Sequence, residues 1–313
     1  MTGESRAADT TSGATKAAGS APEGHTSERG TSEGGTSEGG TFEGREAGTD
    51  LRAADIDAGY GTVQILHDVG LAAMRGRVTA LVGPNGSGKS TLLKVCANLL
   101  DHTGGSVTIR GDDISDLSTR QVATRLALLP QGPTTPPYLT VRDLVEQGRF
   151  AHVGPLGMLR RKDHAAVTRA IELVGLLHMV NRDVDTLSGG ERQRAWLALA
   201  LAQETPVLAL DEPTTFLDIG HQWEVLELVR TLNTERDLTV VMVLHDLNHA
   251  ASFSDHLVVL DKGKVVADGP PWDTLTTDLL RDVFGIEASI IPDPKTDRAL
   301  IVPHAATARL PDG

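Results

Sequence analysis

One short stretch limits the folds open to this chain more than any other. The apolar run Val78–Val82 predicts a buried strand, and Ser90–Leu100 predicts a helix. Between them, Gly83 to Ser90 reads GPNGSGKS and fits the phosphate-binding pattern G-x-x-x-x-G-K-[ST]. A glycine-rich turn with an accidental Lys-Ser pair is the alternative, but the strand and helix on either side disfavour it. The stretch therefore predicts an α/β fold with a phosphate site at a strand-to-helix loop.

The residue types in this loop suit phosphate binding. Gly86 and Gly88 let the backbone turn so that successive N–H groups point at phosphate oxygens. The N-terminus of the following helix adds the positive end of its dipole. Lys89 can reach the β- and γ-phosphates, and Ser90 offers a hydroxyl to Mg²⁺. The predicted nucleotide-binding residues of the loop are Gly83, Pro84, Asn85, Gly86, Ser87, Gly88, Lys89, Ser90 and Thr91.

A second predicted strand ends in two carboxylates. The apolar run Val207–Leu210 is followed directly by Asp211 and Glu212. In enzymes with this phosphate loop an Asp at such a strand end holds Mg²⁺, so Asp211 is the predicted metal ligand. Glu212 is then placed to polarise the attacking water as general base. A solvated acidic turn is the alternative for the pair, and the phosphate loop disfavours it.

A third motif opens another predicted helix. Leu187–Arg194 reads LSGGERQR, in which Ser188 and Glu191 have the S-x-x-E spacing of a capping box. Taken locally, the motif is a helix cap and nothing more. Two glycines at a helix N-terminus also make a second anion-binding site. One chain needs no second such site for one nucleotide, unless the two sites belong to different copies of the chain.

This motif resembles the signature motif of ABC transporter ATP-binding subunits, usually LSGGQ, with Glu191 at the Gln position. In that family the motif contacts the γ-phosphate of ATP held by the opposite subunit, which implies a homodimer with ATP at its interface. The resemblance assigns this role to Ser188, Gly189 and Gly190. It runs from about residue 51 to about residue 285 and implies ATP and Mg²⁺ as cofactors.

Four single residues follow the order of the family's other motifs. Gln131, after the predicted strand Leu126–Leu129, resembles the glutamine that binds Mg²⁺ and links the site to the transmembrane partner. Asp218 resembles the aspartate that crosses the dimer interface, and His245 resembles the histidine that contacts the γ-phosphate. Tyr60 resembles the aromatic residue that stacks on adenine. The resemblance thus implies catalytic roles for Glu212, His245 and Gln131, and Mg²⁺ ligation by Ser90, Gln131 and Asp211.

The remaining pattern predicts a P-loop NTPase of the α/β class. Continuous apolar runs such as Thr239–Leu244 suit strands buried on both faces of a mainly parallel core sheet, with a crossover helix near Ile219–Glu235. The stretch from Ile56 to Val78 predicts short strands of an antiparallel β subdomain. Residues 133–185 lack strong strand runs and predict an α-helical subdomain within the ATP-binding domain.

The two ends of the chain differ from its middle, which we assign to one domain, residues 51–285. Residues 1–50 carry the repeat TSERG, TSEGG, TSEGG, TFEGR with almost nothing apolar, so we expect a disordered, low-complexity tail. Residues 286–313 form a short C-terminal extension, in which Ser289–Ile291 and Ala299–Val302 could pair as a hairpin. A docking or regulatory role is the alternative for the tail, and we assign no function to the extension.

The composition disfavours several classes of protein. A formal net charge of -13 at pH 7 argues against nucleic-acid binding through bulk charge. The single cysteine, Cys96, allows no internal disulfide, and we expect it to be buried. No apolar run approaches the roughly 20 residues that span a bilayer, and the first residues lack the apolar core of a signal peptide. We therefore expect the protein to stay in the cytoplasm, with any membrane association through a partner. The resemblance to ABC transporter ATP-binding subunits then implies a peripheral protein at the cytoplasmic face of the cell membrane.

Three stretches, residues 187–205, 211–222 and 243–260, resemble more narrowly the ATPases of ferric-siderophore importers, close kin of vitamin B12 and haem importers. The run Thr214–Gln222 is the most telling. The resemblance implies a separate transmembrane permease that docks near Thr134–Tyr138. It implies an extracytoplasmic substrate-binding protein as an indirect partner.

Other functions stay open at this point. The cargo could be cobalamin, haem or another metal chelate, because the cargo passes through the permease and should touch no residue of this chain. A soluble ABC ATPase of DNA repair, translation or iron–sulfur assembly is a different class. The single motor domain disfavours a translation ATPase, and the lack of a long heptad insertion disfavours a repair ATPase. An interaction protein with an inactive nucleotide site conflicts with the intact Lys89, Asp211, Glu212 and His245.

Overall fold

A computed structural model describes residues 48–133, 137–154 and 158–307 of the chain. Its central sheet has the strand order β10-β9-β3-β8-β7-β6, with parallel pairing except between β9 and β10. Every residue of β3, β7 and β8 is buried, which explains their continuous apolar sequences and confirms the predicted core sheet. The strands are β3 (Val78–Val82), β6 (Leu126–Leu129), β7 (Val207–Asp211), β8 (Thr239–Val243), β9 (His256–Asp261) and β10 (Lys264–Gly269).

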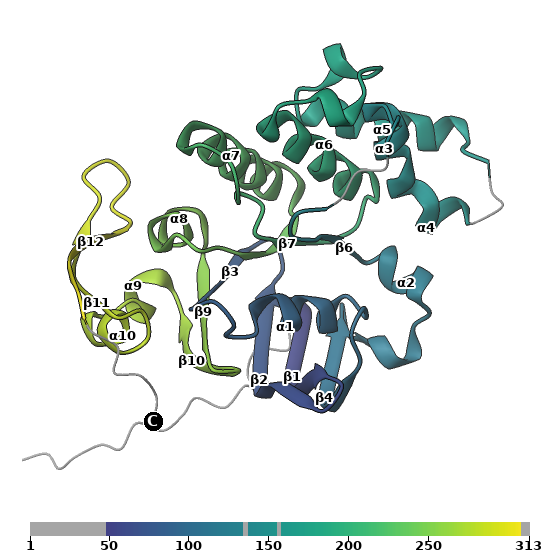
Figure 1. Ribbon diagram of the computed structural model, residues 1–313. Helices are drawn as coiled ribbons and strands as arrows, with labels where there is room; N and C mark the ends of the chain where they lie inside the picture. The colour runs from purple at the N-terminus through teal and green to yellow at the C-terminus, as the bar shows by residue number, and fades with distance from the viewer. Residues whose placement is uncertain (1–47, 134–136, 155–157, 308–313) are drawn as a thin grey trace, which may run out of the picture. The chain divides into compact units, whose positions relative to one another are not determined.

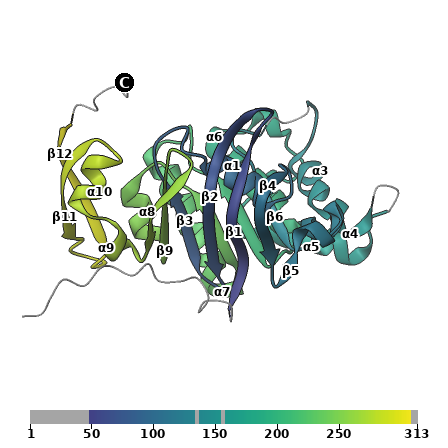
Figure 2. The ribbon, with the colours of Figure 1, turned by 90° about the horizontal axis from the view of Figure 1, so that it is seen from below.

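A second, antiparallel sheet has the order β2-β1-β4-β5 and faces the viewer in Figure 2. The prediction of short strands from Ile56 onward was wrong, because β1 and β2 have 12 residues each. The register of β1 shifts next to Asp55, whose φ is 55°, and this bulge breaks the alternation that would mark one long strand. The strands are β1 (Thr49–Tyr60), β2 (Val63–Met74), β4 (His102–Ile109) and β5 (Asp112–Asp113).

The folded domain begins earlier than residue 51. Asp50 is buried, and its carboxylate accepts hydrogen bonds from Arg75 Nε at 3.1 Å and from Thr239 Oγ1 at 2.8 Å. The backbone N–H of Arg75 also donates to the carbonyl of Gly48 at 2.7 Å. The start of β1 is thus fixed to the beginning of β8. Apart from residues 48–50, the expected disordered tail lies outside the described residues.

The helix after the phosphate loop, α1 (Lys89–Cys96), is shorter than the predicted Ser90–Leu100. Asn98 adopts a left-handed conformation with φ 56°, and the N–H of Leu99 donates to the carbonyl of Lys94 at 2.9 Å. This pattern closes a helix, and Asn tolerates it better than most residues do. Cys96 is buried at the end of α1, as predicted.

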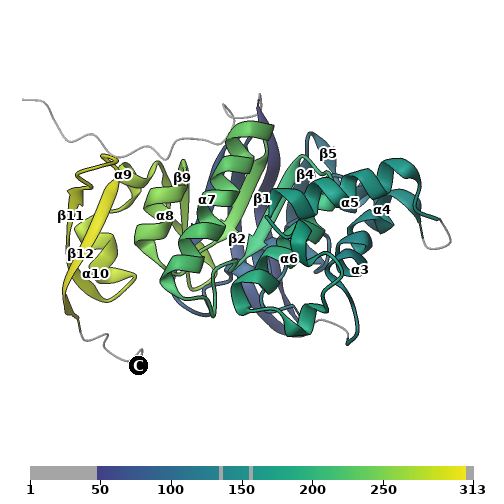
Figure 3. The same cartoon turned by 90° about the horizontal axis from the view of Figure 1, so that it is seen from above.

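Helices cover the face of the core sheet that lies opposite the antiparallel sheet (Figure 3). The helical layer continues past residue 185, because α6 packs against both α3 and α5 (Figure 1). Its helices are α3 (Val141–Glu146), α4 (Phe150–Val153), α5 (Arg161–Leu173) and α6 (Gly189–Ala202).

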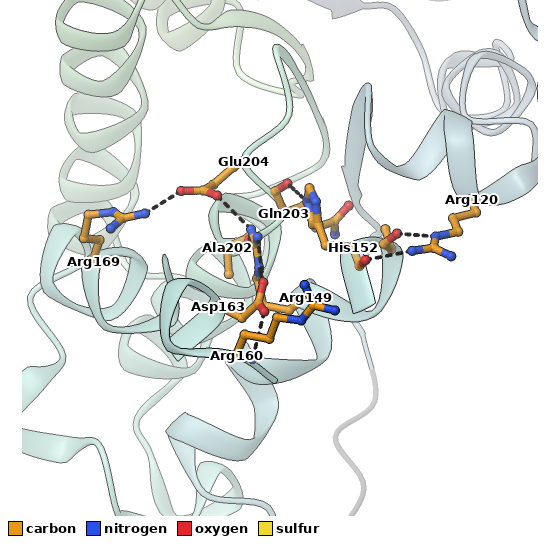
Figure 4. Close-up of polar contacts among 10 residues, drawn as sticks. Arg120, Arg149, His152, Arg160, Asp163, Arg169, Ala202, Gln203 and Glu204 are labelled. Atoms are coloured by element: carbon orange, nitrogen blue, oxygen red, sulfur yellow. Dashed lines mark hydrogen bonds and ion pairs between the residues drawn. The ribbon is translucent and has the colours of Figure 1, made fainter. Parts of the chain in front are cut away.

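A network of polar contacts holds this layer together around the buried Arg149 (Figure 4). Arg149 Nη2 pairs with Asp163 at 3.0 Å, and Nη1 donates to the carbonyl of Ala202 at 2.7 Å. From α2 (Thr119–Ala123), Arg120 donates to the carbonyl of His152 at 2.7 Å and so joins the helical layer to the segment before β6.

The C-terminal residues pack on the core. The expected hairpin forms between β11 (Ile286–Pro292) and β12 (Ala299–Ala306). Asn248 receives a hydrogen bond from the N–H of Ile301 at 2.7 Å, and the buried Ile301 belongs to the main hydrophobic core. The remaining helices are α7 (Ile219–Arg236), α8 (Leu247–Phe253), α9 (Pro271–Thr274) and α10 (Thr277–Asp282). Within the described ranges, no helix is long and apolar enough to cross a membrane.

Candidate active site

The phosphate loop leaves the carboxyl end of β3 and opens α1, the context that its sequence predicted. Gly88 is the N-cap of α1 with a φ of 103°, a left-handed conformation that favours glycine. A Cβ on Gly83 would lie 2.0 Å from the carbonyl oxygen of Leu260, so a side chain there has no room. The loop is therefore closely packed against the neighbouring strands.

The Lys89 side chain lies inside this loop. Its Nζ donates hydrogen bonds to the carbonyls of Gly83 at 2.9 Å and Pro84 at 2.8 Å. Desolvation by burial lowers the pKa of the ammonium group, and the nearby carboxylates of Glu212 and Asp211 oppose that shift. A cation is thus held at the loop with two acidic groups facing it.

Ser90 and Asp211 meet where α1 approaches the end of β7. Ser90 Oγ donates to Asp211 Oδ1 at 2.7 Å. Desolvation by burial raises the pKa of the Asp211 carboxyl group, and the hydrogen bond from Ser90 partly opposes this. One hydroxyl and one carboxylate fit Mg²⁺, which is commonly bound through one or two carboxylates together with waters and substrate phosphates. In the described parts of the chain, no group of three His, Cys, Asp or Glu side chains could hold a metal ion alone.

The Glu212 carboxylate is held by three side chains from different parts of the chain. His245 Nε2 lies 2.6 Å from Oε1, and Thr215 Oγ1 donates to Oε2 at 2.9 Å. The amide of Gln131 also donates to Oε2. Glu212 itself has a φ of 54°, a strained conformation for a residue with a side chain, and such strain gathers at functional sites. These three contacts fix the direction of the carboxylate.

Two features of this cluster did not emerge from the sequence. Thr215 was not predicted as a partner of Glu212. The sequence does offer a signal for it, because two threonines follow closely after Asp211 and Glu212. Gln131 was predicted as a ligand of Mg²⁺, and its amide bonds to Glu212 in this structure. Its assignment to the metal stays a prediction.

One cavity of about 530 Å³ brings most of the predicted residues together. Tyr60 stands at its edge, half exposed, with Lys94 Nζ 5.8 Å from the centre of its ring. Ile65, which the sequence did not single out, also lines the cavity. The lining residues are Tyr60, Ile65, Asn85, Gly86, Gly88, Lys89, Ser90, Thr91, Gln131, Glu212 and His245.

The signature residues lie elsewhere, at the start of α6. Ser188 Oγ accepts from the N–H of Glu191 at 3.3 Å, and Glu191 accepts from the N–H of Ser188 at 2.8 Å, which confirms the capping box. Asp218 is the N-cap of α7 and is exposed. In the described structure, the lining of the cavity does not include Ser188, Gly189, Gly190 or Asp218.

Comparison with known proteins identifies the family to which this chain belongs. A sequence model of the ABC transporter family matches residues 66–215. The ferric enterobactin transport ATP-binding protein FepC of Escherichia coli (strain K12) is 43% identical over 263 residues, covering 84% of this chain and 97% of FepC. The chain belongs to the ABC transporter ATP-binding proteins. It is an ATP hydrolase of that family, with the fold of an ABC cassette.

Two further comparisons extend this assignment. The cobalamin import ATP-binding protein BtuD of Halobacterium salinarum is 42% identical to this ABC ATPase, over 81% of the chain and 63% of BtuD. A solved dimeric structure of a bacterial ABC transporter cassette matches with a TM-score of 0.63 and 28% identity, covering 71% of this chain and 98% of the cassette. The same cassette fold therefore occurs as a dimer in a relative.

Proposed function

We propose that this ABC ATPase works as a homodimer that energises the import of an iron(III)–siderophore complex through a separate transmembrane permease. One observation carries the catalytic part of the proposal. The Glu212 carboxylate is fixed by three side chains on the wall of the cavity that also contains Lys89 and Ser90. A base held beside a phosphate loop suits attack by water on a terminal phosphate.

Several groups in and beside the cavity have defined tasks in this reaction. Lys89 and the N–H groups of the loop bind the β- and γ-phosphates, and Tyr60 stacks on the adenine ring. Ser90, Asp211 and Gln131 would hold Mg²⁺, which neutralises charge that develops on the phosphate oxygens. Glu212 accepts a proton from the attacking water. His245, at hydrogen-bond distance from Glu212, orients that carboxylate and reaches toward the γ-phosphate.

The homodimer supplies the residues that one chain leaves outside its own cavity. Ser188, Gly189 and Gly190 are at a helix N-terminus, where N–H groups and the helix dipole favour an anion. Placed on the γ-phosphate bound by a second copy, they would complete the site. Support comes from their separation from the cavity in one chain and from the dimeric structure of the related cassette.

The iron cargo is supported by similarity. FepC is named for ferric enterobactin transport and is matched over 97% of its length, whereas BtuD is matched over 63%. The permease would hold the ATPase at the cytoplasmic face of the membrane. The expected docking segment near Thr134–Tyr138 lies partly outside the described residues, and its described end, Tyr138, is 86% exposed.

Uptake by cells tests the cargo and the motor together. A strain that lacks this gene should lose uptake of labelled iron(III)–siderophore complexes and keep uptake of labelled cobalamin. The gene for the native chain should restore iron uptake, and the Glu212→Gln variant at equal abundance should not. Loss of cobalamin uptake instead would contradict the iron assignment, and full restoration by Glu212→Gln would contradict the catalytic one.

A further inference from the structure

The first turns of α6 and α7 lie against each other, and glycines of the signature motif make the contact. A Cβ on Gly190 would lie 2.6 Å from Cδ2 of His221 and 3.0 Å from its Cγ. A Cβ on Gly189 would lie 3.7 Å from Leu217, an ordinary contact distance. The imidazole of His221 therefore occupies the space beside Gly190, and a side chain on residue 190 would have to displace it.

The same imidazole also contacts Asp218. His221 Nδ1 lies 2.8 Å from Asp218 Oδ1, and the backbone N–H of His221 donates to that oxygen at 2.9 Å. These hydrogen bonds lower the pKa of the Asp218 carboxyl group, with the backbone N–H as the larger cause. Asp218 is thus an anion whose position depends on the side chain of His221 and on the helix start.

Further contacts keep the two helices in register. Arg194 Nη1 pairs with Glu224 Oε2 at 3.5 Å, about one turn further along both helices. Gln222 Nε2 donates to the carbonyl of Leu217 at 2.9 Å, which fixes the loop Thr214–Asp218 at the start of α7. The pairing therefore does not rest on His221 alone, and removal of its ring should leave both helices folded.

We propose that His221 is a positioning residue that joins Asp218 to the signature glycine Gly190, so that both reach the partner's nucleotide site as one unit. This rests on the proposed homodimer with shared sites. The side chain of His221 is 39% exposed, so it is not needed to fill the core. A single imidazole with one edge on a glycine and one nitrogen on a carboxylate can set the distance between the two groups.

The hydrolysis rate of the full-length ATPase tests this role. His221→Ala should lower kcat about tenfold, the scale of one lost hydrogen bond to a charged group, and leave the KM for ATP within about twofold. The KM should hold because His221 does not line the cavity with Lys89. His221→Asn should restore most of kcat, since its amide nitrogen can reach the oxygen that Nδ1 contacts. The matched control, His178→Asn, changes an exposed histidine of the helical layer and should leave both constants unchanged.

A second pair of variants tests the contact with Gly190. Gly190→Ala alone should nearly abolish hydrolysis, because the new methyl group meets the imidazole. The double variant Gly190→Ala/His221→Ala should hydrolyse ATP faster than Gly190→Ala alone. A double variant no faster than Gly190→Ala, a native kcat for His221→Ala, or His221→Asn no better than His221→Ala would each overturn the proposal.

Sedimentation separates this proposal from the one on which it rests. Glu212→Gln should form a dimer with ATP, and Glu212→Gln/His221→Ala should form it as well with reduced stability. If Glu212→Gln stays monomeric with ATP, the shared site is wrong and the positioning role fails with it. If both variants dimerise equally and His221→Ala hydrolyses normally, the positioning role alone is wrong.

Discussion

The residues that we propose to contact one ATP molecule fall into two groups, and the chain holds these two groups in place in different ways. Lys89, at the start of α1, and Asp211, at the end of the core strand β7, are buried, and we call them the buried half of the site. Ser188 and Asp218 are exposed, and each is held mainly by contacts within its own helix start. The buried half is fixed by the fold, whereas the exposed half is fixed locally and would meet a partner surface in the proposed homodimer. The predictions below test whether this contrast is functional.

The largest effect should come from the buried half. Glu212→Gln keeps the size of the side chain and removes the proton acceptor, so kcat should fall more than about 100-fold. The affinity for ATP should stay unchanged, because phosphate contacts of the loop remain. Phosphate release and equilibrium binding of ATP measure the two quantities. Glu172→Gln, on the exposed face of α5, is the control. A native rate for Glu212→Gln would show that another group is the base.

Mixing two inactive variants should distinguish the two halves. Lys89→Ala disables the cavity, and Gly189→Asp places a negative charge where the partner's γ-phosphate is expected. A Cβ at residue 189 would meet nothing closer than 3.7 Å beyond its own helix, so the fold should tolerate the substitution. Each variant alone should be inactive. A mixture should recover about a quarter of the native rate, because half of randomly formed dimers contain one intact site.

The control for this experiment is a mixture of Lys89→Ala with Glu212→Gln, both in the buried half. No dimer of those two variants contains an intact site, so no activity should return. Recovery in this control, or none in the first mixture, would contradict the division of the site between two chains.

The smallest effect should be on stability. Burial raises the pKa of Asp211, so its ionised form weakens the folded state once the pH exceeds that raised pKa. Asp211→Asn should therefore increase Tm by about 1–3 °C at pH 7.5 without nucleotide or metal, while hydrolysis is lost. The gain should shrink as the pH falls, because Asp211 then binds a proton. Asp282→Asn, at an exposed carboxylate, should leave Tm unchanged; a lower Tm for Asp211→Asn would contradict the burial cost.

The structure agrees with the sequence-based predictions where a local sequence pattern alone determines the element that forms. The strands β3, β7 and β8 are predictable because they are buried on both faces and apolar throughout. The capping box at Ser188 needs residues three apart and nothing else. The bulge at Asp55 hid the length of β1, because a register shift interrupts the alternation of the pattern. The contact of His221 with Gly190 joins two helix starts, and no local pattern reports it.

Cys96 has a practical consequence for attaching labels to this ATPase. It is the single cysteine of the sequence, it is buried, and burial raises the pKa of its thiol to about 12. A thiol of that kind does not react with maleimide reagents in the folded protein. The native chain is thus already a background for single-site labelling. Phe216→Cys, at a side chain that is 93% exposed beside Asp218, would accept a spin label without removal of Cys96.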